Sequence, residues 1–237
     1  MSIYCISDIH GCYNEFMALL KLIQFNPPTD TIYILGDAID RGDNPVECLN
    51  FIINTENIHF IMGNHEQMML DYFDNKNILR QAMNRHVWFN NGGEKTFNQL
   101  KRLGSRRDEA LSYIRSRPYY KTVKINEKQY FLSHAGLDAS LPFNRQRQNA
   151  LLWSREEFYD KKALKSHICI FGHTPTPNLH VGFDCSIWFD KEYNDKICID
   201  CGCAYGGALA AIRLDDEKGF YVKSSRGNKK YRIELSC

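Results

Sequence analysis

Apolar residues in the first third of the chain recur with two spacings that alternate. Short continuous apolar runs, typical of buried strands, are each followed by a segment with apolar residues three and four positions apart, typical of helices. The pattern predicts three units of strand followed by helix. The strands are expected over residues 3–7, 31–35 and 58–62, and the helices that follow them over residues 13–24, 45–53 and 67–73. Pro45 stands at the expected start of the second helix, a position that proline favours.

The rest of the chain changes from helical to mostly strand. Residues 75–118 are polar with helical spacing and a break at Asn91-Gly92-Gly93, and because no linker-like composition isolates them we interpret them as a helical cap. A hairpin is predicted after Pro118, and further strands follow, over residues 119–125 and 129–133, then 167–171, 197–200, 208–214 and 220–222. Together these elements predict one domain over residues 1–237, of mixed α/β class, with two stacked sheets and helices outside.

Polar clusters stand where the predicted strands end. The first three are Ser-Asp-Ile-His-Gly from Ser7, Gly-Asp-Ala-Ile-Asp-Arg-Gly from Gly36 and Gly-Asn-His-Glu from Gly63, and His134 and His173 follow two later strands. Carboxyl ends of neighbouring parallel strands share one edge of a sheet, so these side chains are expected to meet. The remaining histidines lack this context and are interpreted as structural: His59, His86, His167 and His180.

The residue types in these clusters indicate a metal centre with six candidate ligands, Asp8, His10, Asp37, Asn64, His134 and His173. Carboxylate, imidazole and amide oxygen together suit borderline divalent ions such as Mn²⁺, Fe²⁺ or Zn²⁺. Two such ions about 3.5–4 Å apart can clamp an in-line phosphoryl displacement and lower the pKa of bound water to about 7. Arg41 follows Asp40 and offers planar donors that match phosphate oxygens.

Composition excludes several other classes of function. Lys and Arg number 30 against 28 Asp and Glu, so the net charge of +2 gives no global electrostatic case for nucleic-acid or membrane partners. No stretch approaches the ~20 apolar residues that span a bilayer. The basic stretch from Lys223 to Arg232 is interpreted as a solvated tail strand. The nine cysteines are interpreted as reduced thiols of a cytoplasmic protein, with Cys201 and Cys203 as small buried thiols.

Three signature blocks, Asp8-Ile9-His10-Gly11, Gly36 to Gly42 and Gly63 to Glu66, occur in the order and spacing of a known family. Through them the chain resembles the phosphoprotein phosphatase (PPP) superfamily, and within it the short bacterial and lambda-phage-type serine/threonine phosphatases. The resemblance runs from Ile3 to about Ile212. It implies the calcineurin-like metallophosphoesterase fold, a four-layer αββα sandwich.

The resemblance also implies a role for each site residue. Two metal groups share one carboxylate: Asp8, His10 and Asp37 for the first ion, and Asp37, Asn64, His134 and His173 for the second. The resemblance favours manganese for both ions, with iron or zinc as alternatives. Hydroxide held between the ions would attack phosphorus in line, and no phosphoenzyme would form. His65 would protonate the leaving oxygen, and Asp40 would keep its imidazolium protonated near neutral pH. Arg41, Asn64 and Arg155 would bind the phosphate of a phosphorylated protein or peptide.

The chain departs from the family at a few positions. Ser7 replaces a glycine, a change that is not expected to touch the ligands, and Cys201 replaces a common threonine. A long carboxyl-terminal loop of the eukaryotic enzymes is absent, so no eukaryotic-type regulatory subunit is expected. The main alternative is a symmetrical diadenosine tetraphosphate hydrolase, a group that typically lacks the acid equivalent to Asp40 and has aspartate where this chain has Glu66. A binding protein that lost catalysis is a further alternative, and the surface of residues 75–118 is expected to shape substrate choice.

Overall fold

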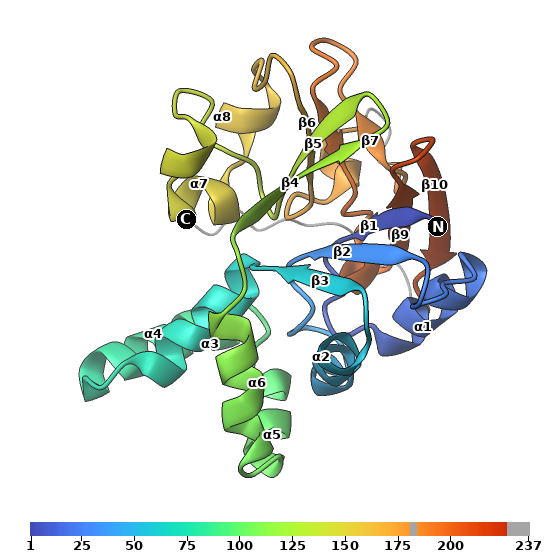
Figure 1. Ribbon diagram of the computed structural model, residues 1–237. Helices are drawn as coiled ribbons and strands as arrows, with labels where there is room; N and C mark the ends of the chain where they lie inside the picture. Colours follow the sequence, from blue (N-terminus) through green and yellow to red (C-terminus); the bar gives the residue numbers. More distant parts are fainter. Residues whose placement is uncertain (181–183, 227–237) are drawn as a thin grey trace.

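The computed structural model describes residues 1–180 and 184–226, which form two stacked five-stranded sheets (Figure 1). The first sheet has, in spatial order, β10 (Lys218–Lys223), β9 (Ala208–Arg213), β1 (Ile3–Ile6), β2 (Thr31–Leu35) and β3 (Ile58–Ile61). The second has β4 (Tyr120–Ile125), β5 (Lys128–Ser133), β6 (Ile168–Phe171), β8 (Lys196–Cys198) and β7 (Trp188–Phe189). β1, β2 and β3 are parallel, so their carboxyl ends lie at one edge.

Alternating side chains in the strands build separate apolar layers. In β1, Cys5 faces the second sheet while Ile6 packs under the helices, because successive strand residues point to opposite faces. In β5, Leu132 faces the first sheet and Phe131 packs on the other side. Three buried clusters result: one between the sheets and one on each outer face.

Helices cover both outer faces. On the first sheet lie α1 (Tyr13–Leu22), α2 (Pro45–Asn54) and α3 (Asn64–Asp74), with α4 (Ile78–Asn90) packed on α3 and with α5 (Glu94–Arg102) and α6 (Arg106–Arg115) packed on α2. On the second lie α7 (Gln148–Trp153) and α8 (Glu156–Tyr159). Short 3₁₀ helices occupy η1 (Phe143–Arg145), η2 (Thr176–Asn178) and η3 (Cys203–Tyr205). The predicted class, two stacked sheets flanked by helices in four layers, is therefore confirmed.

One predicted boundary is wrong in a way that matters for the site. The third helix was expected from Gln67, but α3 begins at Asn64, so the Gly-Asn-His-Glu motif lies in its first turn and not in a loop. Glu66 causes the early start, because its carboxylate accepts the backbone N–H of Gly63 at 3.1 Å and caps the helix. Asn64 and His65 consequently project from a regular, rigid helical turn.

The polar segment of residues 75–118 is helical, whereas the basic stretch from Lys223 is only partly described by the structure. Residues 78–115 are almost entirely helical, as α4, α5 and α6, which extend away from the second sheet (Figure 1). Lys223 ends β10, but Arg226 is not simply solvated, because its guanidinium donates to the backbone oxygen of Arg41 at 3.2 Å. The remaining basic residues, Lys229, Lys230 and Arg232, lie outside the described residues. Within residues 1–180 and 184–226, every helix is too short or too polar to cross a membrane.

Candidate active site

The loops after β2 and β3 touch each other at the carboxyl edge of the first sheet. A Cβ atom on Gly36 would lie 2.4 Å from the Cα of Gly63, and a Cβ on Gly63 would lie 2.2 Å from Asp37 Oδ1. Only glycine permits such an approach of two backbones. The loop after β1 joins them, since the backbone N–H of His10 donates to Asp37 O at 2.8 Å.

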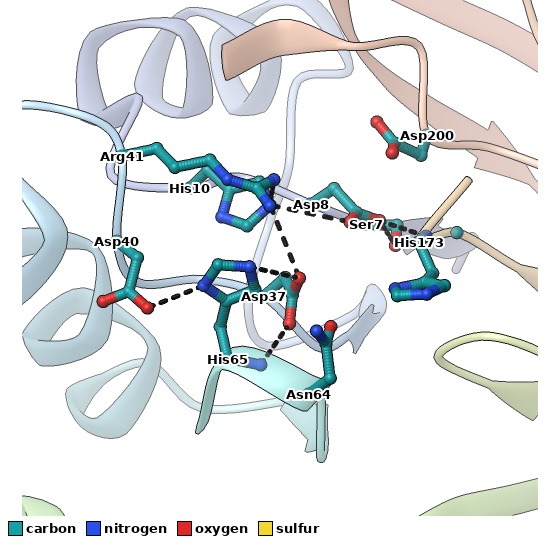
Figure 2. A network of polar contacts seen from close by, with 12 residues as sticks. Ser7, Asp8, His10, Asp37, Asp40, Arg41, Asn64, His65, His173 and Asp200 are labelled. Carbon is teal, nitrogen blue, oxygen red and sulfur yellow. Dashed lines mark hydrogen bonds and ion pairs between the residues drawn. The ribbon is translucent and has the colours of Figure 1, made fainter. Parts of the chain in front are cut away.

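The structure brings together all six candidate ligands, Asp8, His10, Asp37, Asn64, His134 and His173. Figure 2 labels five of them, all except His134. Asp37 Oδ2 lies 3.4 Å from His10 Nε2 and 3.5 Å from His134 Nε2. His134 Nε2 is also 2.8 Å from Asn64 Oδ1 and 3.2 Å from His173 Nδ1. Asp8 Oδ1 lies 3.8 Å from His10 Nε2, and Asp8 Oδ2 accepts the backbone N–H of His173 at 3.0 Å. All six are nine-tenths buried or more.

The hydrogen bonds of two histidines decide which nitrogen faces this cluster. His10 Nδ1 donates to Ile39 O at 2.9 Å, and His134 Nδ1 donates to Leu35 O at 2.8 Å. A carbonyl can only accept, so each Nδ1 carries the proton and each Nε2 turns a lone pair toward Asp37. Lone pairs and carboxylate oxygens at 3.4–3.5 Å repel each other unless a cation lies between them.

Two further atoms meet the same requirement for a cation. Asn64 Oδ1 faces only hydrogen-bond acceptors, and His173 Nδ1 lies 3.2 Å from the unprotonated Nε2 of His134. Two overlapping groups of ligand atoms, each within 4.8 Å, both contain Asp37: Asp8, Asp37 and His134, and His10, Asp37 and His65. Oxygen and nitrogen donors around a shared carboxylate fit borderline divalent cations.

The backbone at this edge adopts conformations that L-residues rarely use. Six site residues have positive φ, between 46° and 70°: Asp8, His10, Asp37, Asp40, Arg41 and His173. Non-glycine residues in the left-handed region are uncommon and cluster at functional sites. The surrounding sheet and helices therefore hold these side chains in positions that the isolated loops would not keep.

Asp40 and His65 form a buried pair beside the ligand cluster. His65 Nδ1 donates to Asp40 Oδ2 at 2.6 Å, and both side chains are 0–1% exposed. His65 Nε2 then points toward Asp37 Oδ2, 3.7 Å away, and has no hydrogen-bond partner among the described residues. An imidazole held in this way presents Nε2 to whatever binds next to Asp37 (Figure 2).

In the protein without ligands, the surroundings of His65 oppose the protonated form that was expected beside Asp40. Burial first, and then the charges of Arg41 and His134, lower the pKa of His65 well below its usual value. Burial raises the pKa of Asp40 to about 7, against hydrogen bonds from Thr96 and Trp88. A phosphate dianion next to Nε2 acts in the opposite direction, since an opposite charge favours the imidazolium.

The two arginines predicted to bind phosphate lie at the rim of the cluster. Arg41 Nη1 is 2.5 Å from His10 Nε2, and its guanidinium lies over the ring of Tyr205, 5.1 Å from the ring centroid. Arg155 caps α8 and reaches Thr174 Oγ1 at 3.4 Å, directly after the ligand His173. Both side chains are therefore within reach of an anion that contacts the buried ligands.

The sequence is similar to a known family over most of its length. A family described as calcineurin-like phosphoesterase matches residues 1–206, and so includes every residue of the cluster. This chain belongs to that family. Serine/threonine-protein phosphatase 2 of Salmonella typhimurium is 31% identical over 220 residues, which are 90% of this chain and 92% of that protein.

Two other proteins that are similar to this calcineurin-like phosphoesterase have different names. The symmetrical bis(5'-nucleosyl)-tetraphosphatase of Erwinia tasmaniensis is 33% identical over 140 residues, but these are 58% of this chain and 45% of that protein. The solved structure of a metallophosphoesterase from Sphaerobacter thermophilus shares the fold, with a TM-score of 0.57, 16% identity and coverage of 98% and 89%. The resemblance found in the sequence is confirmed, and phosphoester hydrolysis with divalent metals follows from the family.

Ser7 corrects one expectation about this phosphoesterase. It was not expected to touch the ligands, but its hydroxyl donates to Asp8 Oδ2. The contact is made because Ser7 is fully buried next to Asp8, where Gly172 leaves space for both side chains. A glycine there would leave Asp8 without this donor, so Ser7 helps to orient a ligand.

Four further residues act at the site without having been predicted: Glu66, Trp88, Thr96 and Asp200. Glu66 accepts the backbone N–H groups of Asp37 at 2.9 Å and Ala38 at 3.0 Å, and so shapes the loop that carries Asp37. Asp200, after β8, lies on the Asp8 side of the cluster (Figure 2), and burial and the Asp8 charge raise its pKa well above the usual value. Glu66 was marked by the Gly-Asn-His-Glu motif and Asp200 by its place at the end of the strand predicted over 197–200, whereas nothing local marked Trp88 and Thr96.

The four histidines interpreted as structural, and also Cys201 and Cys203, make contacts that fit a structural role. Each histidine predicted as structural has a partner away from the site: His59 stacks on Tyr33, His86 bonds to Asn90, His167 packs on Phe143, and His180 bonds to Ser186. Cys201 and Cys203 are buried thiols with exposed fractions of 1%. This agrees with their interpretation as small core residues.

Crowded carboxylates predict a pH dependence of the metal-free protein. Burial raises the pKa of Asp8 to about 6, of Asp37 to about 8 and of Glu66 to about 8. A carboxyl with a raised pKa holds its proton more tightly when folded, so stability is lost as pH rises through these values. The site histidines, whose pKa values are lowered, reduce stability only below about pH 6.5.

The melting temperature of chelator-treated protein is therefore expected to fall by about 5–10 °C between pH 6.5 and pH 8.5. Differential scanning fluorimetry across this range, with and without Mn²⁺, measures the effect. Metal should remove most of the decline, because cations replace the protons. A metal-free protein whose melting temperature is constant over these two pH units would contradict the raised pKa values of the buried carboxyl groups.

Proposed function

We propose that this calcineurin-like phosphoesterase is a protein serine/threonine phosphatase that hydrolyses phosphomonoesters with two divalent cations. The Asp40–His65 pair carries the proposal, because a buried imidazole 2.6 Å from a carboxylate presents Nε2 beside the ligand cluster. Serine and threonine leave as poor alkoxides and need a proton at the moment of cleavage. A phosphoanhydride, which releases a nucleotide, needs much less help of this kind.

In the proposed reaction the protein's own residues bind and position the ester. Arg41 and Arg155 bind equatorial phosphate oxygens, since guanidinium donors match them in pairs, and the Asn64 amide adds a further contact. Divalent cations held by the six ligands would supply water of lowered pKa and neutralise phosphate charge. His65 Nε2 gives a proton to the leaving oxygen. The Nδ1–H of the same ring remains hydrogen-bonded to Asp40 and holds the imidazole in its orientation.

The relatives support this choice of substrate and also an alternative. The Salmonella relative named as a serine/threonine-protein phosphatase aligns along 92% of its length. The Erwinia relative, named as a symmetrical bis(5'-nucleosyl)-tetraphosphatase, aligns along 45% of its length at slightly higher identity, 33% against 31%. Diadenosine tetraphosphate hydrolysis is therefore the second candidate, and the buried acid pair favours the phosphoprotein.

A direct comparison of substrates tests the proposal. Purified protein with Mn²⁺ is expected to give a kcat/KM for a phosphoserine peptide at least about tenfold above that for diadenosine tetraphosphate. The Asp40→Asn variant should lose much of the peptide activity and little of any nucleotide activity, because only the alkoxide needs the acid. Faster hydrolysis of the nucleotide by orders of magnitude would reverse the assignment.

We also propose manganese as the working metal and a phosphorylated protein in the cytoplasm as the substrate. Six oxygen and nitrogen ligands without a thiolate suit Mn²⁺ and Fe²⁺ as well as Zn²⁺. No nucleic-acid, membrane or eukaryotic-type regulatory partner is part of this proposal, since the net charge of +2 offers no broad basic field. Reconstituting the metal-free protein with each ion in turn would rank the metals by kcat.

A further inference from the structure

Asp40 is held by two residues of the helical segment that follows the catalytic motifs. Thr96 Oγ1 donates to Asp40 Oδ1 at 2.5 Å, and Trp88 Nε1 donates to Asp40 Oδ2 at 2.8 Å. Oδ2 also accepts from His65 Nδ1 at 2.6 Å. The four residues have exposed fractions of 0%, so no solvent competes for these bonds.

The chemistry of the two donors leaves the carboxylate little freedom. An indole N–H can only donate, so Trp88 requires an acceptor lone pair on Oδ2. The Thr96 hydroxyl already accepts the backbone N–H of Asp40 at 3.0 Å, so its proton is directed to Oδ1. The plane of the carboxylate is therefore fixed from both ends, and Oδ2 stays in line with the imidazole.

The turn between α4 and α5 is built around the same loop. Gly92 O accepts the backbone N–H of Arg41 at 3.1 Å. A Cβ on Gly93 would lie 2.4 Å from Trp88 Nε1, so only glycine leaves room for the indole there. Rings of Tyr72 and Phe97 pack at 5.8 Å and 6.4 Å from Trp88 and hold it in place. The Asn91-Gly92-Gly93 break thus marks a support for the site and not merely the end of a helix.

We propose that Trp88 and Thr96 are positioning residues for the general acid, and that they act by fixing Asp40 against His65. This inference rests on the acid role of His65 in the proposed function. Residues 78–102 then carry part of the catalytic apparatus, in addition to any surface for substrate choice. A displacement of the imidazole by a fraction of an ångström would misdirect Nε2 from the leaving oxygen.

Leaving-group dependence separates this role from a merely structural one. A defect in proton donation slows the hydrolysis of a phosphoserine peptide, because its alkoxide is a poor leaving group. It hardly affects the hydrolysis of para-nitrophenyl phosphate, because the phenolate leaves without a proton. A general loss of structure or of metal slows both substrates alike. The ratio of the two kcat values is therefore the informative quantity.

Thr96→Val, which keeps the shape and removes the hydroxyl, is expected to lower kcat for the phosphoserine peptide by about tenfold. For para-nitrophenyl phosphate the change should stay within about twofold. Thr96→Ser should restore most of the peptide activity, because it restores the donor. Thr55→Val is the matched control: it removes a threonine hydroxyl that donates to Phe51 O at 2.7 Å at the end of α2, and it should change neither rate.

Trp88→Phe provides a second variant should Thr96→Val fold poorly, since it keeps an aromatic ring and removes only the N–H and part of the ring volume. Circular dichroism and bound-metal content accompany each variant. Equal slowing of both substrates by folded, metal-loaded Thr96→Val and Trp88→Phe overturns the positioning role, as do unchanged rates. If His65→Asn itself shows no leaving-group dependence, the acid role in the proposed function fails. If only His65→Asn shows it, the roles of Thr96 and Trp88 fail.

Discussion

Replacing His65 with asparagine is expected to lower kcat for a phosphoserine peptide by about 10²–10⁴-fold, the usual contribution of a positioned proton donor. Asparagine can still accept or donate at the position that faces Asp40, but it offers no group that titrates next to the leaving oxygen. KM should change little, because in the proposed reaction the phosphate is bound by Arg41 and Arg155, which lie at the rim of the cluster. Steady-state kinetics with a phosphoserine peptide measures both quantities.

Bound-metal content is the accompanying measurement, because His65 lies next to the ligand Asn64 and within 3.7 Å of Asp37. The acid role requires that the variant keeps its cations while it loses turnover. His59→Asn is the matched control, since this histidine stacks on Tyr33 in the first sheet, away from the cluster, and it should have wild-type kinetics. An unchanged rate in His65→Asn would remove the acid role and leave the metals to act without it.

Much of this site was predictable because its ligands follow strands in short motifs. Asp8 and His10 follow β1, Asp37 follows β2, and Asn64 follows β3, so the parallel order of three adjacent strands brings them to one edge. The fold was predictable for the same reason, since apolar runs and helical spacing alternate over the first 74 residues. Periodicity along the chain is enough where neighbours in space are successive elements.

The supports of the site were not predictable, because they depend on contacts between distant residues. Thr96 lies 56 positions from Asp40 and Trp88 lies 48 positions away, and neither is marked by a local pattern. The effect of Ser7 on Asp8 depends on Gly172, which directly follows β6 of the other sheet. The protonation of His65 depends on the summed charges and burial of the cluster, which only the folded geometry specifies.

The charge at Asp37 has opposite consequences for folding and for catalysis. Without cations, its burial among lone pairs of His10 and His134 opposes folding above its raised pKa of about 8. With cations, the same carboxylate would be the ligand shared by the two overlapping groups of candidate donors. Asp37→Asn should therefore abolish detectable activity, a loss of at least about 10³-fold, because metal catalysis supplies several kcal/mol of transition-state stabilisation.

Two measurements on Asp37→Asn distinguish loss of metal from loss of fold. Wild-type protein saturated with Mn²⁺ should melt about 5–10 °C above its metal-free form. The variant should lose this shift, yet its metal-free form should melt no lower than metal-free wild type at pH 8.5, because a buried charge has been removed. Asp216→Asn, which removes an exposed carboxylate paired with Arg213, is the matched control and should keep the metal-induced shift. A variant of Asp37 that binds Mn²⁺ and turns over normally would show that this carboxylate does not hold the metals, since no other residue joins the two groups of ligands found in the described part of the chain.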